Sequence, residues 1–166
     1  MSCFCRWFAI LAMAACLTPA TAGETNRSVQ PAKLRFESQF ILAEVARRMN
    51  VTLRPEIPAP TIFFESTTPL RQFQDAIVGQ WRFRPHVFAN AYSAVRNEIY
   101  LIDEAAYYKR VGRTLDDSLA HELAHYLQVM YLNADLADPS LESDAVAVQH
   151  GFQQDHVYPK RAEAGR

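Results

Sequence analysis

The chain has 166 residues, a length that favours a single domain, and 49% of them are hydrophobic while 21% are charged. This is an ordinary globular composition, so the chain can bury a core. The formal net charge of -1 comes without any Lys/Arg-rich block or basic stripe, so we expect no nucleic-acid partner.

The first 22 residues have the layout of a secretory signal peptide. A positive charge at Arg6 precedes an apolar run over residues 7–17, and residues 20–22 (ATA) form a small-residue cleavage pattern. The run is too short to cross a bilayer as a helix, so no membrane span is expected. The segment therefore predicts an exported protein, either periplasmic or secreted.

All three cysteines lie inside this predicted signal peptide. One of them ends residues 13–16 (MAAC), which resemble a lipobox, so a lipoprotein anchored through Cys16 is the alternative to the soluble form. Cleavage after Ala22 would leave residues 23–166, which contain no cysteine. We expect that form to be one domain with a disordered lead-in over residues 23–30, no disulfide and no cysteine ligand for a metal.

The next part of the chain alternates helical and extended patterns. Apolar residues recur at helical spacing over residues 31–50, which predicts an amphipathic helix, and residues 61–65 predict a strand. Thr68 is a predicted N-cap with Pro69 at the first helical position, for a helix that runs to about Val78 and ends near Gly79.

Extended structure is expected after this helix. Residues 81–89 are aromatic and predict an extended segment. Residues 97–103 (NEIYLID) predict a strand, with Ile99 and Leu101 on one face and Tyr100 and Ile102 on the other.

Two further helices are expected towards the C-terminus. The first starts near Thr114 or Asp116 and runs to about Leu132, and the acids Asp116 and Asp117 suit the positive end of its dipole, a capping role rather than a catalytic one. The second has Asp138 as its N-cap, Pro139 at its first position and Gly151 just past its end.

The first of these helices carries a metal-binding pattern. His121 and His125 are four positions apart, so on a helix both imidazoles lie on one face and can bind one ion. Glu122 projects beside them, close enough to take a proton from a water at the metal. This is the H-E-x-x-H arrangement. A pair of ordinary surface histidines is the alternative.

A catalytic zinc needs a third protein ligand and one open position. The best candidate is Glu142, which lies 17 positions after His125 on the next predicted helix. Glu142, Ala145 and Gln149 share one face of that helix, and the small Ala145 would allow a close approach to the metal helix. The remaining histidines, His86, His150 and His156, are expected to be structural or exposed.

Residues 121–128 (HELAHYLQ), followed by residues 142–145 (ESDA), resemble the gluzincin branch of zinc metallopeptidases, to which thermolysin belongs, and small bacterial zincin-like families. The resemblance covers about residues 99–151. It implies an α+β fold, a minimal zincin-like domain in which a small mixed or antiparallel sheet places an edge strand over the H-E-x-x-H helix and a Glu-bearing helix follows. The implied edge strand is residues 97–103, which would pair with an extended peptide.

The resemblance also implies site residues. It implies Zn²⁺ ligands at His121, His125 and Glu142 and a general base at Glu122. One departure matters, because many gluzincins carry an acid four residues after the ligand Glu that orients a zinc histidine, and this chain has Val146 there. The group that orients the histidines is therefore open.

The oxyanion-stabilising residue is open as well. Tyr126 is expected to pack rather than act, and His150, His156 and Tyr158 are the downstream candidates.

Together these patterns predict a zinc-dependent hydrolase, most concretely a metallopeptidase that acts on a peptide or protein substrate. Two alternatives stay open: a non-catalytic metal-binding or interaction domain with a zincin fold, and a zinc amidase that acts on cell-wall material.

Overall fold

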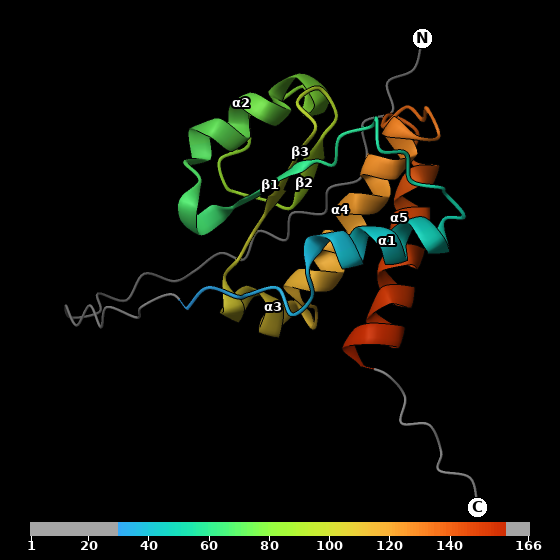
Figure 1. Ribbon diagram of the computed structural model, residues 1–166. Coiled ribbons are helices and arrows are strands. Elements are labelled where there is room, and N and C mark those ends of the chain that lie inside the picture. The colour runs from blue at the N-terminus through green and yellow to red at the C-terminus, as the bar shows by residue number, and fades with distance from the viewer. Residues whose placement is uncertain (1–29, 159–166) are drawn as a thin grey trace, which may run out of the picture.

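The computed structural model describes residues 30–158, so the predicted signal peptide, the lipobox and most of the predicted lead-in lie outside the described residues. The chain is α+β, as predicted (Figure 1). Its elements in order are α1 (Ser38–Arg48), β1 (Thr61–Phe64), the short 3-10 helix η1 (Glu65–Thr67), α2 (Leu70–Trp81), β2 (Ala91–Ser93), β3 (Glu98–Leu101), α3 (Ala105–Val111), α4 (Leu115–Met130), α5 (Ser140–Phe152) and the π-helical turn η2 (Gln153–Val157).

None of the helices within this described part combines the length and the apolar character that crossing a membrane requires.

The three strands form one small mixed sheet in the order β1-β3-β2. β3 pairs in parallel with β1 and antiparallel with β2, so it is the central strand. The expectation that residues 97–103 form an edge strand is therefore wrong, and β1 and β2 are the two edge strands instead. Residues 82–89 contain no strand, since α2 extends to Trp81 and the extended backbone that pairs with β3 begins only at Ala91.

The alternation along β3 separates two apolar clusters, as the sequence predicted. Ile99 and Leu101 belong to the main core with α1, α4 and α5. Tyr100 points to the opposite face, where it packs with Phe73 and Phe88 beneath α2. Figure 1 shows the same arrangement, with α2 on one side of the sheet and α1, α4 and α5 grouped on the other. The sheet thus supports α4 from one face and is covered by α2 on the other.

Helix α1 begins at Ser38, later than the predicted start at residue 31. Residues 30–37 form no helix, and several of their backbone N–H groups donate to distant parts of the chain. Ala32 N–H donates to Asp103 O at 2.5 Å, and the N–H groups of Arg35 and Phe36 donate to the buried Asp116 carboxylate at 2.8 and 3.0 Å. Asp116 therefore fastens the N-terminal segment to the start of α4, which a helical pattern alone does not reveal.

The predicted boundaries of α2 are also wrong. Pro69 occupies the N-cap position rather than the first helical position, and Thr68 ends η1 instead of capping α2. The helix continues through Gly79, where a side chain would meet nothing within 4 Å, and ends only where Arg82 adopts a φ of 59°. A glycine in a helix is tolerated, so Gly79 is not a stop signal here.

Helix α5 starts at Ser140 and likewise runs through the glycine that was predicted to follow it. Asp138 accepts a hydrogen bond from Ser140 N–H at 2.9 Å, although Pro139 holds the N-cap position. A Cβ at Gly151 would collide with the Arg48 guanidinium. Gly151 therefore leaves room for the Arg48 guanidinium beside α5, and does not end the helix.

Candidate metal site

Helix α4 carries both histidines, and its start is fixed by a capping box. Thr114 Oγ1 accepts from Asp117 N–H at 3.2 Å, and the Asp117 carboxylate accepts from Thr114 N–H at 2.8 Å. These contacts satisfy backbone donors that the first helical turn leaves free. The predicted helix, and the capping role of Asp117, are confirmed.

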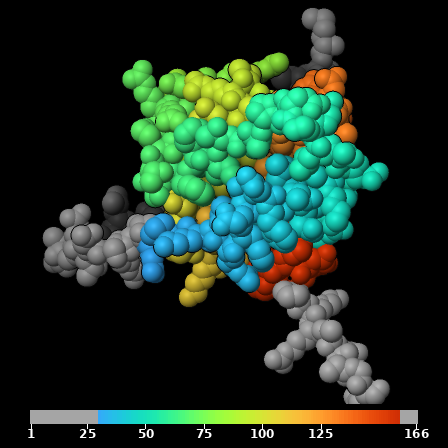
Figure 2. Space-filling view, in the orientation of Figure 1, coloured from blue at the N-terminus to red at the C-terminus, as the bar shows by residue number. Residues whose placement is uncertain are grey.

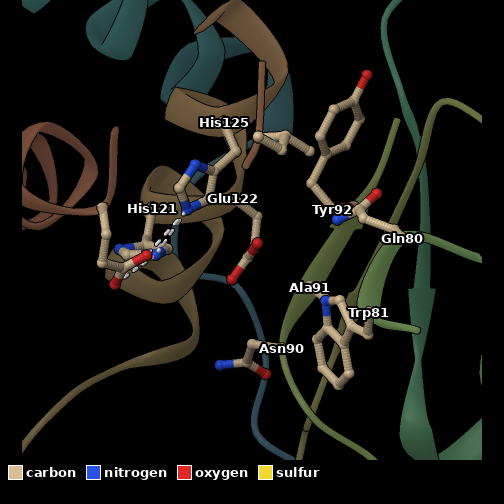
Figure 3. Close-up of a pocket in the computed structure, with 10 residues that line it drawn as sticks. Gln80, Trp81, Asn90, Ala91, Tyr92, His121, Glu122 and His125 are labelled. Carbon is tan, nitrogen blue, oxygen red and sulfur yellow. Dashed lines mark hydrogen bonds and ion pairs between the residues drawn. The ribbon is translucent and has the colours of Figure 1, made fainter. Parts of the chain in front are cut away.

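Most of α4 is buried, because α1, α5 and the sheet pack around it. In the space-filling view the blue to cyan segment, which includes α1, lies on this face of the molecule (Figure 2). The two histidines are only partly buried and point into a pocket (Figure 3). A packed helix of this kind holds its side chains on a rigid support.

Helix α5 packs against α4 and brings the third predicted ligand to the histidines. Ala145 is fully buried between the helices, as its small size predicted. Glu142 Oε1 lies 3.5 Å from His121 Nε2, and Glu142 Oε2 lies 3.3 Å from His125 Nε2. The two Nε2 atoms are 3.2 Å apart. One ligand atom from each of the three residues lies within 4.8 Å of the others, so together they could hold a metal ion.

His125 is held in a defined orientation by Gln128. The Gln128 side-chain NH2 donates to Leu141 O at 2.9 Å, so its oxygen faces His125 Nδ1, at 2.8 Å. An amide oxygen only accepts, so Nδ1 must carry the proton. His125 Nε2 then presents its lone pair to the cluster, which is the state that a metal ligand requires.

The surroundings of His121 differ from those of His125. Its Nδ1 is buried and has no hydrogen-bond partner among the described residues. Burial, followed by the neighbouring His125, lowers the pKa of His121 to about 4, although Glu142 acts in the opposite direction. The ring is therefore neutral at pH 7, the form that binds metals.

Glu122 lies on the side of α4 that faces β2, with its carboxyl group in the pocket (Figure 3). It is only 5% exposed. Burial, then the charge of Glu142, raises its pKa to about 8, while a backbone contact with Tyr92 lowers it. A carboxyl group with this pKa exchanges its proton near neutral pH, which is the property needed for general acid–base chemistry.

The pocket that contains this cluster has a volume of about 300 Å³. Its walls come from α2, from β2 and the residue before it, from α4 and α5, and from the loop between those two helices, through Gln80, Trp81, Asn90, Ala91, Tyr92, His121, Glu122, His125, Leu136 and Glu142. All four predicted site residues therefore line one cavity.

Comparison of the chain with protein-family models, with curated proteins and with solved structures found no match. The interpretation of this site therefore depends on its geometry and chemistry.

The other residues considered from the sequence lie away from the pocket. Tyr126 packs in the core and donates its hydroxyl proton to Pro58 O at 3.0 Å, as expected. His156 contacts Glu44 at 3.1 Å and packs on Phe152, while His150 and Tyr158 are exposed. None of the three downstream oxyanion candidates lines the pocket, so the structure does not support that role for them.

Several site residues were not identified from the sequence. Gln128 follows His125 by three positions on one helix, a spacing that brings side chains together, so it could have been found. Gln149 was placed on the correct face of α5 but given no role. Nothing local marks the wall formed by Asn90 and β2, or Arg113, whose Nη1 donates to Gln149 Oε1 at 2.8 Å, because these reach the site only through tertiary packing.

Proposed function

We propose that this protein is a zinc-dependent hydrolase, and more concretely a metallopeptidase. The observation that carries the proposal is the convergence of His121, His125 and Glu142 in one pocket with the buried acid Glu122. Export through the predicted signal peptide, in a soluble or a lipidated form, is part of the same proposal.

The donor set supports zinc. Two imidazoles and one carboxylate, with one position open, are typical of catalytic zinc sites. Ligand bonds of about 2.0–2.1 Å in a tetrahedron place neighbouring ligand atoms about 3.3 Å apart. The two histidine Nε2 atoms are 3.2 Å apart, close to this spacing, and each lies near a different oxygen of Glu142, at 3.5 Å for His121 and 3.3 Å for His125. Glu142 keeps 63% of its side chain exposed, so the cluster stays accessible from solvent.

When bound, a zinc ion supplies Lewis-acid chemistry, since it acidifies water and polarises a carbonyl oxygen. The chain's own groups would do the rest. Gln128 keeps the lone pair of His125 directed at the cluster. Glu122 takes a proton from the attacking water and later delivers it to the leaving amine.

The edge of the sheet supports a peptide as substrate. Among the described residues β2 pairs with β3 on one side only, and Asn90, Ala91 and Tyr92 line the pocket. A strand edge can bind an extended peptide through backbone hydrogen bonds, and on this edge the peptide would replace the Gln80 side chain, whose Nε2 donates to Tyr92 O at 3.0 Å. We therefore assign to β2 the substrate-pairing role that the resemblance had implied for residues 97–103.

Two observations favour a non-catalytic metal-binding domain as the second candidate. His121 Nδ1 has no partner within the described residues, and Val146 occupies the position where an orienting acid would be expected. A site that only stores or senses a metal tolerates a loosely oriented ligand. Such a site does not need the buried acid Glu122.

Replacement of Glu122 tests the hydrolase directly. The zinc-reconstituted Glu122→Gln variant should keep one zinc per chain and lose about 10²–10⁴-fold of its hydrolytic rate, because it lacks the acid–base group. Rates on casein, on a peptide library and on peptidoglycan fragments would also separate a peptidase from a cell-wall amidase. The exposed Glu56→Gln variant is the matched control. Unchanged hydrolysis in Glu122→Gln would contradict the mechanism.

Replacement of His125 tests the ligand set. The His125→Ala variant should lose its metal, because a site with two protein ligands has a much lower affinity for zinc than a site with three. Metal content per chain, measured by inductively coupled plasma mass spectrometry, gives the result. The exposed His86→Ala variant should retain a full complement. A full complement in His125→Ala would refute the assignment of this ligand.

A further inference from the structure

A second lobe of the pocket extends from the ligand cluster towards the start of α4. Its volume is about 240 Å³. It shares Asn90, His121, Glu122 and Glu142 with the first lobe. Its other lining residues include both polar and apolar side chains: Ala89, Ile102, Tyr107, Arg113, Ser118 and Gln149. A substrate bound at the cluster can therefore extend into a chamber that differs chemically from the first.

Arg113 is the cation of this second lobe. The described residues that line the first lobe include no Lys or Arg, and Arg113 is the single one that lines the second. It follows Gly112, whose φ of 66° ends α3, and its backbone N–H donates to Tyr108 O at 3.2 Å. Its Nη1 donates to Gln149 Oε1 at 2.8 Å. The turn and this hydrogen bond hold the guanidinium at the wall.

Arg113 is exposed and makes no direct ion pair with the part of the protein that the structure describes. Within residues 30–158 it forms no ion pair with a carboxylate, and its side-chain hydrogen bond goes to a neutral amide. A guanidinium has five N–H donors in a planar fork and remains charged at all relevant pH values. The ligand that such a fork binds best is a carboxylate, through two parallel hydrogen bonds.

We infer that the second lobe binds a carboxylate of the substrate through Arg113, so that the enzyme prefers peptides with a free carboxylate near the scissile bond. This inference rests on the proposed hydrolase function. Glu142 and Gln149 are seven positions apart on α5, about 10 Å along the helix. An extended peptide covers about 3.3–3.6 Å per residue, so the carboxylate belongs within about three residues of the cleaved bond.

The carboxylate has two possible sources, the C-terminus of the peptide or an Asp or Glu side chain. The first arm of the test uses N-acetylated peptides of one sequence with a C-terminal carboxylate or a C-terminal amide. The second arm uses amidated peptides that carry Glu or Gln at one of the three positions after the cleaved bond. In at least one arm kcat/KM should favour the carboxylate about tenfold or more. Equal kcat/KM in both arms would overturn the inference.

Variants assign the preference to Arg113. Arg113→Gln should reduce the ratio of the two kcat/KM values to about one, mainly through KM, while Arg113→Lys keeps part of it. Lys109→Gln removes a positive charge from the neighbouring exposed surface of α3 and should keep the full preference. If Arg113→Gln slows the carboxylate and amide peptides equally, Arg113 only supports Gln149 and the inference fails.

A binding measurement separates this inference from the proposed hydrolysis. Zinc-loaded Glu122→Gln protein is titrated with the same peptides by calorimetry, with and without Arg113→Gln, after each variant is checked for zinc content and melting temperature. The carboxylate peptide should bind about tenfold more weakly without Arg113, and the amide peptide equally in both. If the unaltered protein cleaves nothing but this difference is observed, hydrolysis fails and the carboxylate site stands. If cleavage occurs and this difference is absent, the reverse holds.

Discussion

Two buried glutamines flank the ligand cluster and hold different parts of it. Gln128 on α4 and Gln149 on α5 are each 1% exposed. Gln128 contacts one of the proposed metal ligands, since its side-chain oxygen accepts a hydrogen bond from His125 Nδ1. Gln149 instead joins Arg113 to Asp117, with contacts of 2.8 Å on both sides. The two glutamines are equally buried but act differently: one amide orients the proposed metal ligand His125, and the other connects the start of α4 to the second lobe.

The largest expected effect of this difference is on metal affinity. Gln128→Leu removes the acceptor of His125 Nδ1, so the ring loses its fixed tautomer and orientation. Loss of such a partner typically weakens metal binding about 10–100-fold. Zinc dissociation constants from competition with a chelator would measure it. Gln128→Glu, which can still accept from Nδ1, is the control and should bind zinc more tightly than Gln128→Leu. Unchanged affinity in Gln128→Leu would remove the distinction between the two glutamines.

Gln149→Leu should act mainly on folding stability. It leaves the buried Asp117 without one of its hydrogen-bond donors, and an unsatisfied buried polar group costs about 1–3 kcal/mol. Urea denaturation of the metal-free protein would measure the change in unfolding free energy. Its zinc affinity should change less than that of Gln128→Leu. A larger loss of zinc affinity would mean that Gln149 orients His121 and that the two glutamines act alike.

The pKa values of Glu122 and His121 are shifted mainly by burial, and titration should reveal this. The pKa of Glu122 in the fold is about 8 against an ordinary 4.5, so its stabilising contribution is complete below pH 4.5 and is lost as pH rises through 8. The pKa of His121 is about 4 against 6.5, so its contribution is lost as pH falls below 6.5. Between pH 6.5 and 8 the effect of Glu122 therefore acts without that of His121.

The metal-free protein should consequently be less stable at pH 8 than at pH 6.5, and Glu122→Gln should remove much of that slope. Urea denaturation at several pH values in this window provides the measurement. An identical slope in the unaltered protein and in Glu122→Gln would show that the fold does not raise the pKa of Glu122.

The parts of the site that the sequence predicted correctly depend on local signals. The periodicity around His121 and the acids after Thr114 defined α4, and the small Ala145 predicted close packing of α5. The missed parts depend on distant contacts. β2 has only three residues, too few for a periodic pattern, and its role as the edge follows from pairing with β3. Gly151 was misread because the Arg48 side chain that packs beside it lies about 100 positions earlier.

The position of the three ligands along the chain has a consequence for folding order. His121 and Glu142 are 21 positions apart, and one helical hairpin brings them together. The facing wall at Ala91 begins 30 positions before His121 and depends on sheet pairing. Contacts at short sequence separation generally form sooner than non-local strand pairing. We expect the proposed ligand cluster to assemble before the wall at β2 during folding, so that, under the proposed function, a nascent chain would be able to bind a metal before it could bind a peptide.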